Sequence, residues 1–514
     1  MRDELVFYVN GERHAVRGRA AGATLSDYLR DGSLHDSGLG NGGLREGCGM
    51  DGGCGASLTG TKIACAEGDC GACTVLVGEP IDGRLSYRSI DACIAFVYQM
   101  DGRHVVTVEG LADSGSLTPV QTAMVDCHGS QCGFCTPGFV MAMHGALEEH
   151  GATVDEETWR VELSGNLCRC TGYRQILDAA AQCAAAGYGG MCSRYDEAPI
   201  VDDLMSLDRS VRVNARASHE SNGHTPTGAD VFLPSTLDEL LAARAERPEA
   251  KLVAGATDVG VQHNHGKINP TAVILTARVP ELQRLEVIDG ELVIGAAVDW
   301  SRIERFSESE LPEYHQILTR FGSPQVRHTG TLVGNLANAS PIADSLPFHY
   351  VAESTIELAS VTGRREAPIE SFYQGYKQLD LRPDEIIAAV RTPLPDAGVY
   401  HKLYKVSKRR DMDISTVTLG LWLRIDSDDT VTDARLAAGG VGPTVVRLPA
   451  AEGALLGVGF SLAAMEAAGR EAADAITPIT DVRGSDAYRR NVIENLFSKA
   501  WHDRQVDPAA SVVT

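Results

Sequence analysis

The sequence predicts a multidomain α+β protein with three or four domains, and three observations support this class. The chain has 514 residues, which is more than one ordinary hydrophobic core organises. Its apolar content of 44% and charged content of 22% are typical of folded globular domains. Strand-like and helix-like patterns follow one another in blocks along the chain, so more than one kind of domain is expected.

The first predicted domain, residues 1–111, is an α+β unit with a cysteine-rich loop at its middle. Residues 5–9 and 12–16 predict two strands joined by Asn-Gly, a pair that hairpin turns prefer. A short helix is expected near residues 25–30 and another strand at residues 105–108.

The second predicted domain, residues 112–186, consists of four helices. Thr-Pro pairs at 118–119 and 136–137 each place a hydroxyl N-cap before a proline at the first helical position. Apolar residues recur at helical spacing after residue 137, and two further helices are expected at residues 156–163 and 173–185.

The remaining chain predicts a linker and two further domains. Residues 187–227 are rich in Gly, Ser, Asn and Asp and predict the linker. Residues 228–398 alternate strand-like runs, such as 251–253, with glycine turns and short helices. Residues 399–514 form a last α+β unit that includes a helical stretch at 462–475.

The charge and the hydropathy pattern exclude several classes of partner. A formal net charge of −23 repels phosphate backbones and anionic lipid, so neither nucleic acid nor a membrane surface is expected as a partner. The sequence has no apolar run long enough for a membrane span and no secretion signal at its start. A cytoplasmic protein is therefore expected.

The cysteines gather in one part of the chain. All thirteen lie between Cys48 and Cys192, and the second half of the chain has none. In a reducing compartment, clustered cysteines are metal ligands more often than disulfide partners. The metal or redox chemistry is therefore expected in the first two domains.

The first cysteine group has the spacing C-x4-C-x2-C, with a fourth cysteine downstream. Its members are Cys65, Cys70, Cys73 and Cys93. This is the spacing of plant-type [2Fe–2S] ferredoxins, and the glycines between the ligands let backbone N–H groups turn toward sulfur. A zinc site is the rival reading, although structural zinc usually has two paired C-x2-4-C units.

The second group joins a C-x2-C pair to a C-x-C pair, in Cys132, Cys135, Cys168 and Cys170. Both pairs come just before a predicted helix start, where partial positive charge favours thiolates and a negative cluster. Zinc remains possible for this group on spacing alone.

Taken together, the two groups resemble the iron–sulfur region of the molybdenum hydroxylases. The resemblance depends on the motifs QCGFCTPG at residues 131–138 and GNLCRCTGY at residues 165–173, which follow the ferredoxin-like group. Within that family, the chain most resembles the small subunit of the xanthine dehydrogenase branch. The likeness implies two [2Fe–2S] clusters, with the helical domain holding the one nearer the molybdenum centre.

The resemblance also implies a fold for each domain. It implies an N-terminal β-grasp ferredoxin-like domain and a four-helix [2Fe–2S] domain. It further implies an FAD-binding domain of the vanillyl-alcohol-oxidase/PCMH type and a C-terminal α+β flavoprotein subdomain.

The flavin site is predicted at a strand, a glycine turn and a helix start in residues 250–260, a pattern that is weak evidence by itself. The resemblance implies that this segment and a second glycine-rich segment wrap the diphosphate and ribityl chain of FAD. The residues of the two segments are Leu252, Val253, Ala254, Gly255, Ala256, Thr257, Asp258 and Val259, then Thr331, Leu332, Val333, Gly334 and Asn335.

Four single residues complete the FAD site that the resemblance implies. Asp344 would accept hydrogen bonds from the cofactor's hydroxyls, Phe321 would lie beside the isoalloxazine, and Ile387 and Lys405 would complete the pocket. The plainer alternatives are that Phe321 and Ile387 belong to the core and that Lys405 is a solvated charge.

The implied activity is electron transfer from a molybdenum centre through two clusters to FAD and then to NAD+. Residues 409–414 resemble the family's loop where NAD docks. The molybdenum cofactor is expected on a separate large subunit, in a dimer of heterodimers, so no catalytic residue is assigned to this chain. Another hydroxylase, acting on an aldehyde or an N-heterocycle, is the first alternative, and a zinc-stabilised scaffold without redox chemistry is the second.

An apparent insertion at about residues 31–58 departs from the family pattern. Its Cys48 and Cys54 echo the first cysteine group, which favours a degenerate duplicate over an additional metal site or redox pair. A glycine pattern at 38–43 matches G-x-G-x-x-G, but no apolar strand precedes it, so we reject a dinucleotide site there. The other three cysteines, Cys127, Cys183 and Cys192, are expected to be ordinary thiols.

Overall fold

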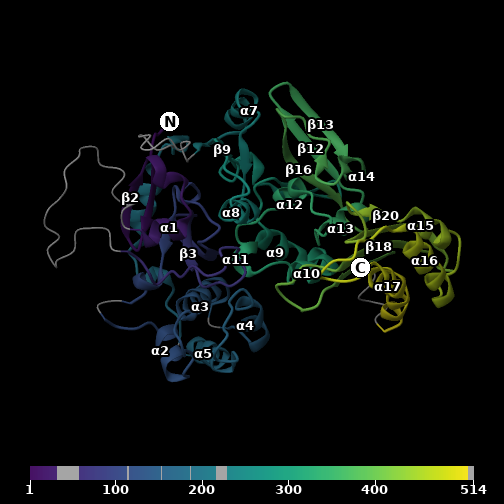
Figure 1. Cartoon of the computed structure of the whole chain (residues 1–514), viewed down its shortest axis with the longest axis horizontal. Helices are drawn as coiled ribbons and strands as arrows, with labels where there is room; N and C mark the ends of the chain where they lie inside the picture. The colour runs from purple at the N-terminus through teal and green to yellow at the C-terminus, as the bar shows by residue number, and fades with distance from the viewer. Residues whose placement is uncertain are drawn as a thin grey trace. The chain divides into compact units, whose positions relative to one another are not determined.

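The structure, a computed structural model, describes residues 1–31, 57–112, 115–151, 153–185, 187–215, 229–396 and 398–506 (Figure 1). The predicted sites at Cys48, Cys54 and residues 38–43 lie outside the described residues. The chain forms two compact units. The first contains Met1–Leu240, Glu249–Arg278 and Gly322–Gly330, and the second contains Leu241–Pro248, Val279–Phe321 and Thr331–Thr514. The predicted FAD-binding domain, residues 228–398, therefore contributes to both units.

The N-terminal part of the first unit is built on a mixed five-stranded sheet. The sheet has the order β2-β1-β5-β3-β4. Its strands are β1 Leu5–Val9, β2 Glu12–Val16, β3 Thr74–Ile81, β4 Arg84–Asp91 and β5 His104–Val106, and helix α1 spans Leu25–Arg30. The predicted hairpin is confirmed, because β1 and β2 pair antiparallel through Asn10 and Gly11, both of which have positive φ. Strand β5 pairs parallel with β1.

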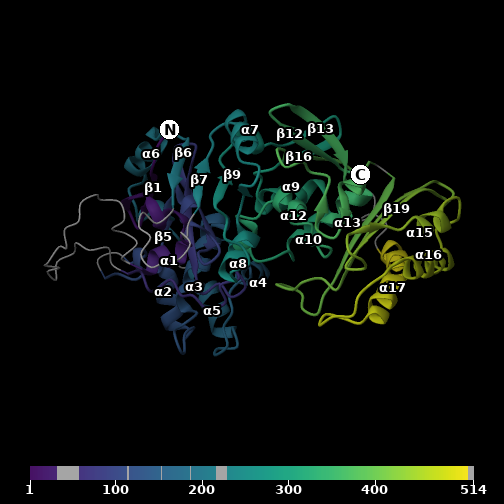
Figure 2. The same ribbon diagram turned by 45° about the horizontal axis from the view of Figure 1, so that its top comes forward.

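The predicted four helices are also confirmed. They are α2 Pro119–Asp126, α3 Thr136–His150, α4 Glu156–Glu162 and α5 Arg174–Ala185, and they lie together in both views (Figures 1 and 2). Thr118 caps α2 as predicted, in a capping box with Gln121. The expected N-cap of α3 is displaced by one residue: Cys135 occupies that position and Thr136 is already helical. The helix thus begins directly at a predicted cluster ligand.

The described part of the predicted linker is folded, which corrects the prediction for residues 187–227. Helix α6 Glu197–Ser206 and strand β6 Val211–Asn214 both lie in it. Composition was misleading here because β6 gains its stability from pairing with β7 Asp230–Leu233, a distant partner that local periodicity does not reveal. With β8 Lys251–Val253 and β9 Ala272–Leu275 these strands form a four-stranded sheet of order β6-β7-β9-β8.

Short helices accompany the β6-β7-β9-β8 sheet. Helix α8 Thr257–Asn264 follows β8, and the single turn of α11 Pro324–Arg327 belongs to the segment Gly322–Gly330 of the first unit. Helix α7 Leu237–Glu246 has residues in both units.

The second unit contains two main sheets and a small hairpin, β14 Tyr373–Gly375 with β15 Gln378–Leu379. The first sheet has the order β10-β11-β16-β12-β13 and is antiparallel throughout. Its strands are β10 Leu285–Ile288, β11 Glu291–Gly295, β12 Thr355–Ser360, β13 Gly363–Pro368 and β16 Ile386–Pro393. The helices between these strands are α9 Trp300–Glu310, α10 Pro312–Leu318, α12 Leu332–Asn338, α13 Leu346–Val351 and α14 Ile369–Phe372.

The second sheet of this unit, β17-β18-β19-β20, is covered by helices from the end of the chain (Figure 2). Its strands are β17 Val399–Val406, β18 Val417–Ile425, β19 Val431–Gly439 and β20 Val446–Arg447, and the helices are α15 Pro449–Leu455, α16 Leu462–Ala475 and α17 Asp486–Val506. Arg489 on α17 is 2% exposed and donates to the carbonyl oxygen of Gly440 at 2.8 Å and to Asp481 at 2.7 Å. One buried guanidinium thus holds two loops of this subdomain together.

The multidomain α+β class is therefore confirmed. Each unit has buried apolar residues of its own, because the apolar faces of its sheets pack against the apolar sides of its helices. Within the described ranges, none of the helices combines the length and the apolar character that crossing a membrane requires.

Candidate iron–sulfur and flavin sites

The first cysteine quartet, Cys65, Cys70, Cys73 and Cys93, gathers at one end of the N-terminal sheet. Cys73 immediately precedes β3, and Cys93 follows β4, which pairs with β3 along its length. Hydrogen bonds link Cys65 to Cys70, Cys65 to Cys93, and Cys73 to Cys93. Residues far apart in sequence thus come together because the β3–β4 hairpin brings its two ends side by side.

The loop that carries the first three ligands follows a path that turns its backbone repeatedly. Ala66, Gly68 and Gly71 all have positive φ, a conformation that glycine adopts without strain. As a result, the backbone N–H of Glu67 donates to the sulfur of Cys65 at 3.4 Å. Such N–H···S bonds stabilise negative charge on sulfur and favour a metallated thiolate.

The second quartet consists of two pairs that join the two predicted ligand loops. Cys135 is hydrogen-bonded to Cys168, and Cys132 to Cys170. The sulfur of Cys168 also lies 3.1 Å from the hydroxyl oxygen of Thr171 and 3.5 Å from its backbone nitrogen. Each pair takes one thiol from each loop, and two pairs of thiolates are what two iron atoms require.

The spacing of the sulfur atoms distinguishes a two-iron cluster from a single zinc ion. Four thiolates bound to one zinc ion at about 2.3 Å would place every pair of sulfur atoms about 3.8 Å apart. Among the described residues, only one group brings three potential ligand atoms within 4.8 Å of one another, and it contains no cysteine. Neither quartet therefore converges on a single ion, and both fit a [2Fe–2S] cluster, which divides its four ligands between two metals.

The thiol pKa values show how strongly the members of a quartet interact. Hydrogen bonds from the thiols of Cys70 and Cys93 lower the pKa of Cys65. Burial opposes ionisation of Cys168, but hydrogen bonds from Thr171, Cys170 and Cys135 together outweigh it and lower the pKa of Cys168. Burial and the bond to Cys168 raise the pKa of Cys135 to about 12. Hydrogen bonding from Cys93 also lowers the pKa of Cys73, so at least one thiolate in each quartet is stabilised by the groups around it.

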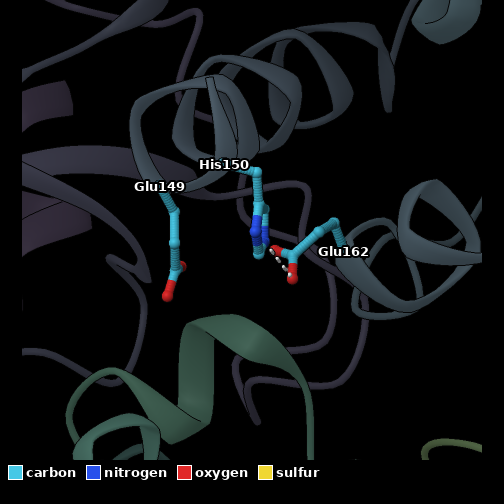
Figure 3. Close-up of side chains that lie close together, drawn as sticks. All are labelled: Glu149, His150 and Glu162. Carbon is cyan, nitrogen blue, oxygen red and sulfur yellow. Dashed lines mark hydrogen bonds and ion pairs between the residues drawn. The ribbon is translucent and has the colours of Figure 1, made fainter. Parts of the chain in front are cut away.

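The only described group with three convergent potential ligands of a single metal ion consists of Glu149, His150 and Glu162 (Figure 3). Figure 3 shows the three side chains approaching one another from α3 and α4. His150 lies 3.2 Å from Glu162, and Glu149 lies 3.2 Å from His328. Ion pairing accounts for this group, and we assign no metal to it.

The first predicted FAD segment begins in β8, where Leu252 and Val253 lie, and ends in the first turn of α8. Ala256 stands between them in the left-handed conformation, with φ of 63°. A Cβ at Gly255 would lie 1.7 Å from the carbonyl oxygen of Thr329, so only glycine permits this close approach of two backbones. The predicted strand, turn and helix start are thus present, and the N-terminal turn of a helix suits a diphosphate.

The second predicted FAD segment begins at the N-cap of α12 in the second unit. The hydroxyl oxygen of Thr331 accepts the N–H of Gly334 at 3.0 Å, which fixes the first turn. Leu332 is fully buried, whereas Asn335 is only partly buried and accepts a hydrogen bond from Ser345 at 2.9 Å. The segment is therefore a capped helix start, as the diphosphate site requires.

Asp344 and Lys405 form an ion pair at 2.6 Å, and their side chains are 7% and 2% exposed. Ser415 donates to the other carboxylate oxygen, and Lys405 also donates to the carbonyl oxygen of Arg320 at 2.9 Å. The alternative of a solvated Lys405 is therefore wrong. A buried pair of this kind is costly to break from either side, so both residues belong to one rigid group.

Phe321 and Ile387 occupy positions that ordinary core residues also occupy. The ring of Phe321 packs against Trp300, with ring centroids 4.8 Å apart. Ile387 is 5% exposed and lies on β16, the middle strand of its sheet. Their contacts with a flavin stay predictions.

Four residues near the first quartet were missed by sequence reasoning. Asp91 is 2% exposed, accepts from Cys73 at 3.6 Å, and burial raises its pKa well above its usual range. Asn264, at the end of α8, donates to the carbonyl oxygens of both Ala66 and Cys93 at 2.8 Å. Asn166 and its neighbour Gln325 form a buried amide pair. The only available signal was the position of Asn166 within the motif at 165–173.

Three family models match this chain. Residues 107–181 match a [2Fe-2S] binding domain, residues 226–395 match the FAD binding domain in molybdopterin dehydrogenase, and residues 402–504 match the CO dehydrogenase flavoprotein C-terminal domain. These matches, together with the two cysteine quartets, define the class of protein: an iron–sulfur flavoprotein.

Comparison with similar proteins identifies the family within this class. Xanthine dehydrogenase of Emericella nidulans is 30% identical to this chain, and the match covers 98% of this chain and 38% of that protein. Xanthine dehydrogenase of Drosophila pseudoobscura pseudoobscura is 31% identical, and the match covers 87% of this chain and 35% of that protein. The chain thus spans less than two fifths of the length of these relatives. A carbon monoxide dehydrogenase chain from Hydrogenophaga pseudoflava is 26% identical with a TM-score of 0.51, covering 54% of this chain and 98% of that one. The chain belongs to the molybdenum hydroxylase family and corresponds to its iron–sulfur and FAD-binding part.

Proposed function

We propose that this chain is the electron-transfer subunit of a molybdenum hydroxylase, most similar to xanthine dehydrogenase. Electrons would enter from a molybdenum cofactor on a large partner subunit, pass through both cysteine quartets and reach FAD, with NAD+ as the final acceptor. The observation that carries the proposal is the pairing of thiols in both quartets, neither of which brings three sulfur atoms within 4.8 Å of one another.

When bound, the two [2Fe–2S] clusters carry electrons singly, and FAD takes up two of them. The residues of this chain hold and tune these groups. Cys65, Cys70, Cys73 and Cys93 would hold one cluster, and Cys132, Cys135, Cys168 and Cys170 the other. Backbone N–H groups and the hydroxyl of Thr171, already directed at sulfur, stabilise negative charge at the ligands.

The residues that would hold FAD come from two helix starts and one buried ion pair. The turn before α8 and the N-cap of α12 would bind the diphosphate through backbone N–H groups. The Asp344–Lys405 pair is fixed by Ser415, so its carboxylate would present an acceptor to a cofactor hydroxyl without reorganising. Docking of NAD+ at residues 409–414 rests on the resemblance alone.

The finer fold assignments belong to the same proposal. The mixed sheet β2-β1-β5-β3-β4 with helix α1 supports a β-grasp ferredoxin-like domain. The two glycine turns support an FAD-binding domain of the vanillyl-alcohol-oxidase/PCMH type. A cytoplasmic dimer of heterodimers is the assembly that the family resemblance implies.

Metal and flavin analysis of the purified chain tests the proposal. We expect iron and acid-labile sulfide sufficient for two clusters, bound FAD, and two distinct EPR signals after reduction with dithionite. A colourless protein that contains zinc instead of iron would overturn the proposal and favour the non-redox scaffold.

The substrate is tested separately, because the pocket that selects it is expected on the partner. The complex with its co-purified large subunit should reduce NAD+ with xanthine as donor. Activity with aldehydes or N-heterocycles, but not with xanthine, would assign the chain to another branch of the family and leave its electron-transfer role intact.

A further inference from the structure

A buried pair of side-chain amides joins the ligand loops of the two quartets. Asn166 is 4% exposed and Gln325 is 1% exposed. The Nε2 of Gln325 donates to Oδ1 of Asn166 at 2.8 Å, and Nδ2 of Asn166 donates to the carbonyl oxygen of Gly71 at 3.0 Å. Gly71 lies inside the first ligand loop, and Asn166 comes two residues before the ligand Cys168. The chain of hydrogen bonds therefore runs from one loop to the other.

Gln325 fixes the orientation of the Asn166 amide. An asparagine amide has a donating and an accepting side, and only the donating side is compatible with the carbonyl oxygen of Gly71. Because Gln325 supplies a donor to Oδ1, the amide of Asn166 is held with Nδ2 toward Gly71. The same Nε2 lies 3.4 Å from the hydroxyl of Thr74, which directly follows the first loop.

Glycines allow the backbones to meet at this point. A Cβ at Gly71 would lie 2.4 Å from Nδ2 of Asn166, and a Cβ at Gly165 would lie 2.2 Å from Oε1 of Gln325. Beside the amide pair, the N–H of Leu167 donates to the carbonyl oxygen of the ligand Cys70 at 2.9 Å. The two ligand loops are thus in direct contact, and the amides close that contact on one side.

Gln325 stands in a segment that continues into predicted flavin residues at both ends. Its segment, Gly322–Gly330, belongs to the first unit and lies between Phe321 and Thr331 in sequence. The Oε1 of Gln325 is buried and has no hydrogen-bond partner among the described residues. An apolar side chain would avoid that cost, so an amide at this position indicates a role for its Nε2 donor.

We propose that Asn166 and Gln325 are positioning residues that set the separation and relative orientation of the two [2Fe–2S] clusters. The inference rests on the proposed function, because it requires both quartets to be metallated. In the step concerned, one electron would pass from the cluster held by the second quartet to the cluster held by the first, with no bond formed or broken and no proton moved. Tunnelling rates fall steeply with distance, so a small displacement of one loop slows this step.

The test uses the full-length protein reduced with dithionite, in which both clusters are paramagnetic. Magnetic coupling between the clusters splits their EPR signals at low temperature and depends steeply on their separation. We expect Gln325→Leu and Asn166→Asp to keep both signals at full intensity, with the splitting reduced or broadened. The rate of electron transfer between the clusters, measured after flash photoreduction, should fall several-fold in both variants.

His328→Asn is the matched control. His328 belongs to the same segment and is also buried, but its ring contacts the carbonyl oxygen of Ser89 and the carboxylate of Glu149, not a ligand loop. This variant should lose stability and keep the wild-type splitting. Unchanged splitting in both Gln325→Leu and Asn166→Asp would overturn the inference and leave the proposed function standing. A wild-type protein without two cluster signals would overturn both.

Discussion

The two cysteine quartets belong to the same unit of the molecule, yet the chain encloses them differently. In the first quartet, Cys73 and Cys93 are 1% and 2% exposed and form part of a hydrophobic core. In the second quartet, Cys132 and Cys170 are exposed. Two ligands of the first quartet are thus built into the interior of a sheet domain, whereas two ligands of the second lie at the surface of a helical one.

This difference follows from the elements that supply the ligands. A β-hairpin delivers Cys73 and Cys93 from its two ends, so their side chains enter the core beside the sheet. The segments that precede α3 and α5 deliver the second quartet, and Cys132 and Cys170 are exposed there, whereas Cys168 is 6% exposed. Solvent exposure and hydrogen bonds to sulfur both shift cluster potentials, so the two clusters are expected to differ in potential and in lability.

Removal of one ligand from each quartet is expected to have the largest effect. Cys93→Ala and Cys170→Ala should each abolish one EPR signal and halve the iron content. Cys93→Ala should also lower the free energy of unfolding by more than about 2 kcal/mol, because the loop it anchors is part of the core. Thermal unfolding of both variants and iron analysis test this comparison.

Cys192→Ala is the control for both ligand variants, since Cys192 is exposed and lies outside the quartets. It should keep wild-type iron and stability. Equal destabilisation by Cys93→Ala and Cys170→Ala would show that burial does not distinguish the two sites.

Alanine at one glycine of each ligand loop gives the next largest effect. Gly71 and Gly133 have φ of 62° and 82°, so alanine strains either backbone by about 1 kcal/mol. At Gly71 a Cβ would also meet Asn166 and the carbonyl oxygen of Gly165 at 2.4 and 2.5 Å, whereas at Gly133 it would meet nothing within 4 Å. Gly71→Ala should therefore cost about 1–3 kcal/mol more in chemical denaturation. Equal costs for the two variants would contradict the tight contact of the loops.

The features that could be predicted from the sequence are those that depend on residues close together in the chain. The C-x4-C-x2-C and C-x-C spacings, the Asn10-Gly11 hairpin and the Thr118 cap are local features, and all of them are present in the structure. Asn166 and Gln325 could not be paired from sequence, because 159 positions separate them and no periodicity relates them. The strand β6 was missed for the same reason, since its partner β7 lies beyond a polar stretch.

The rates at which the two clusters lose iron test the difference in exposure between the two quartets. A hydrophilic ferrous-iron chelator, added to the reduced protein, reaches exposed ligands before buried ones. The EPR signal of the second quartet should therefore disappear several-fold faster than that of the first, because Cys132 and Cys170 are exposed. The two signals are assigned beforehand with the Cys93→Ala and Cys170→Ala variants. Simultaneous loss of both signals, or earlier loss of the first, would contradict the difference in enclosure.

The smallest expected effect comes from the hydrogen-bond donors to the cysteine sulfurs of each quartet. The sulfur of Cys65 accepts a hydrogen bond from the backbone N–H of Glu67, and only a proline at position 67 would remove that donor. The sulfur of Cys168, in contrast, lies 3.1 Å from the side-chain hydroxyl of Thr171. Thr171→Val removes that hydroxyl. Because a hydrogen bond to sulfur stabilises the more negative, reduced cluster, its loss should lower the potential of the second cluster.

The expected shift is on the order of 40 mV, which corresponds to about 1 kcal/mol for one hydrogen bond and one electron. Redox titration followed by EPR resolves it, and the first cluster serves as an internal reference in the same sample. Thr136→Val is the matched control, since the Thr136 hydroxyl donates to Ser130 at 2.8 Å and, within the described part of the chain, to no sulfur. A potential that rises or stays constant in Thr171→Val would mean that the second quartet, like the first, is tuned by its backbone and not by this side chain.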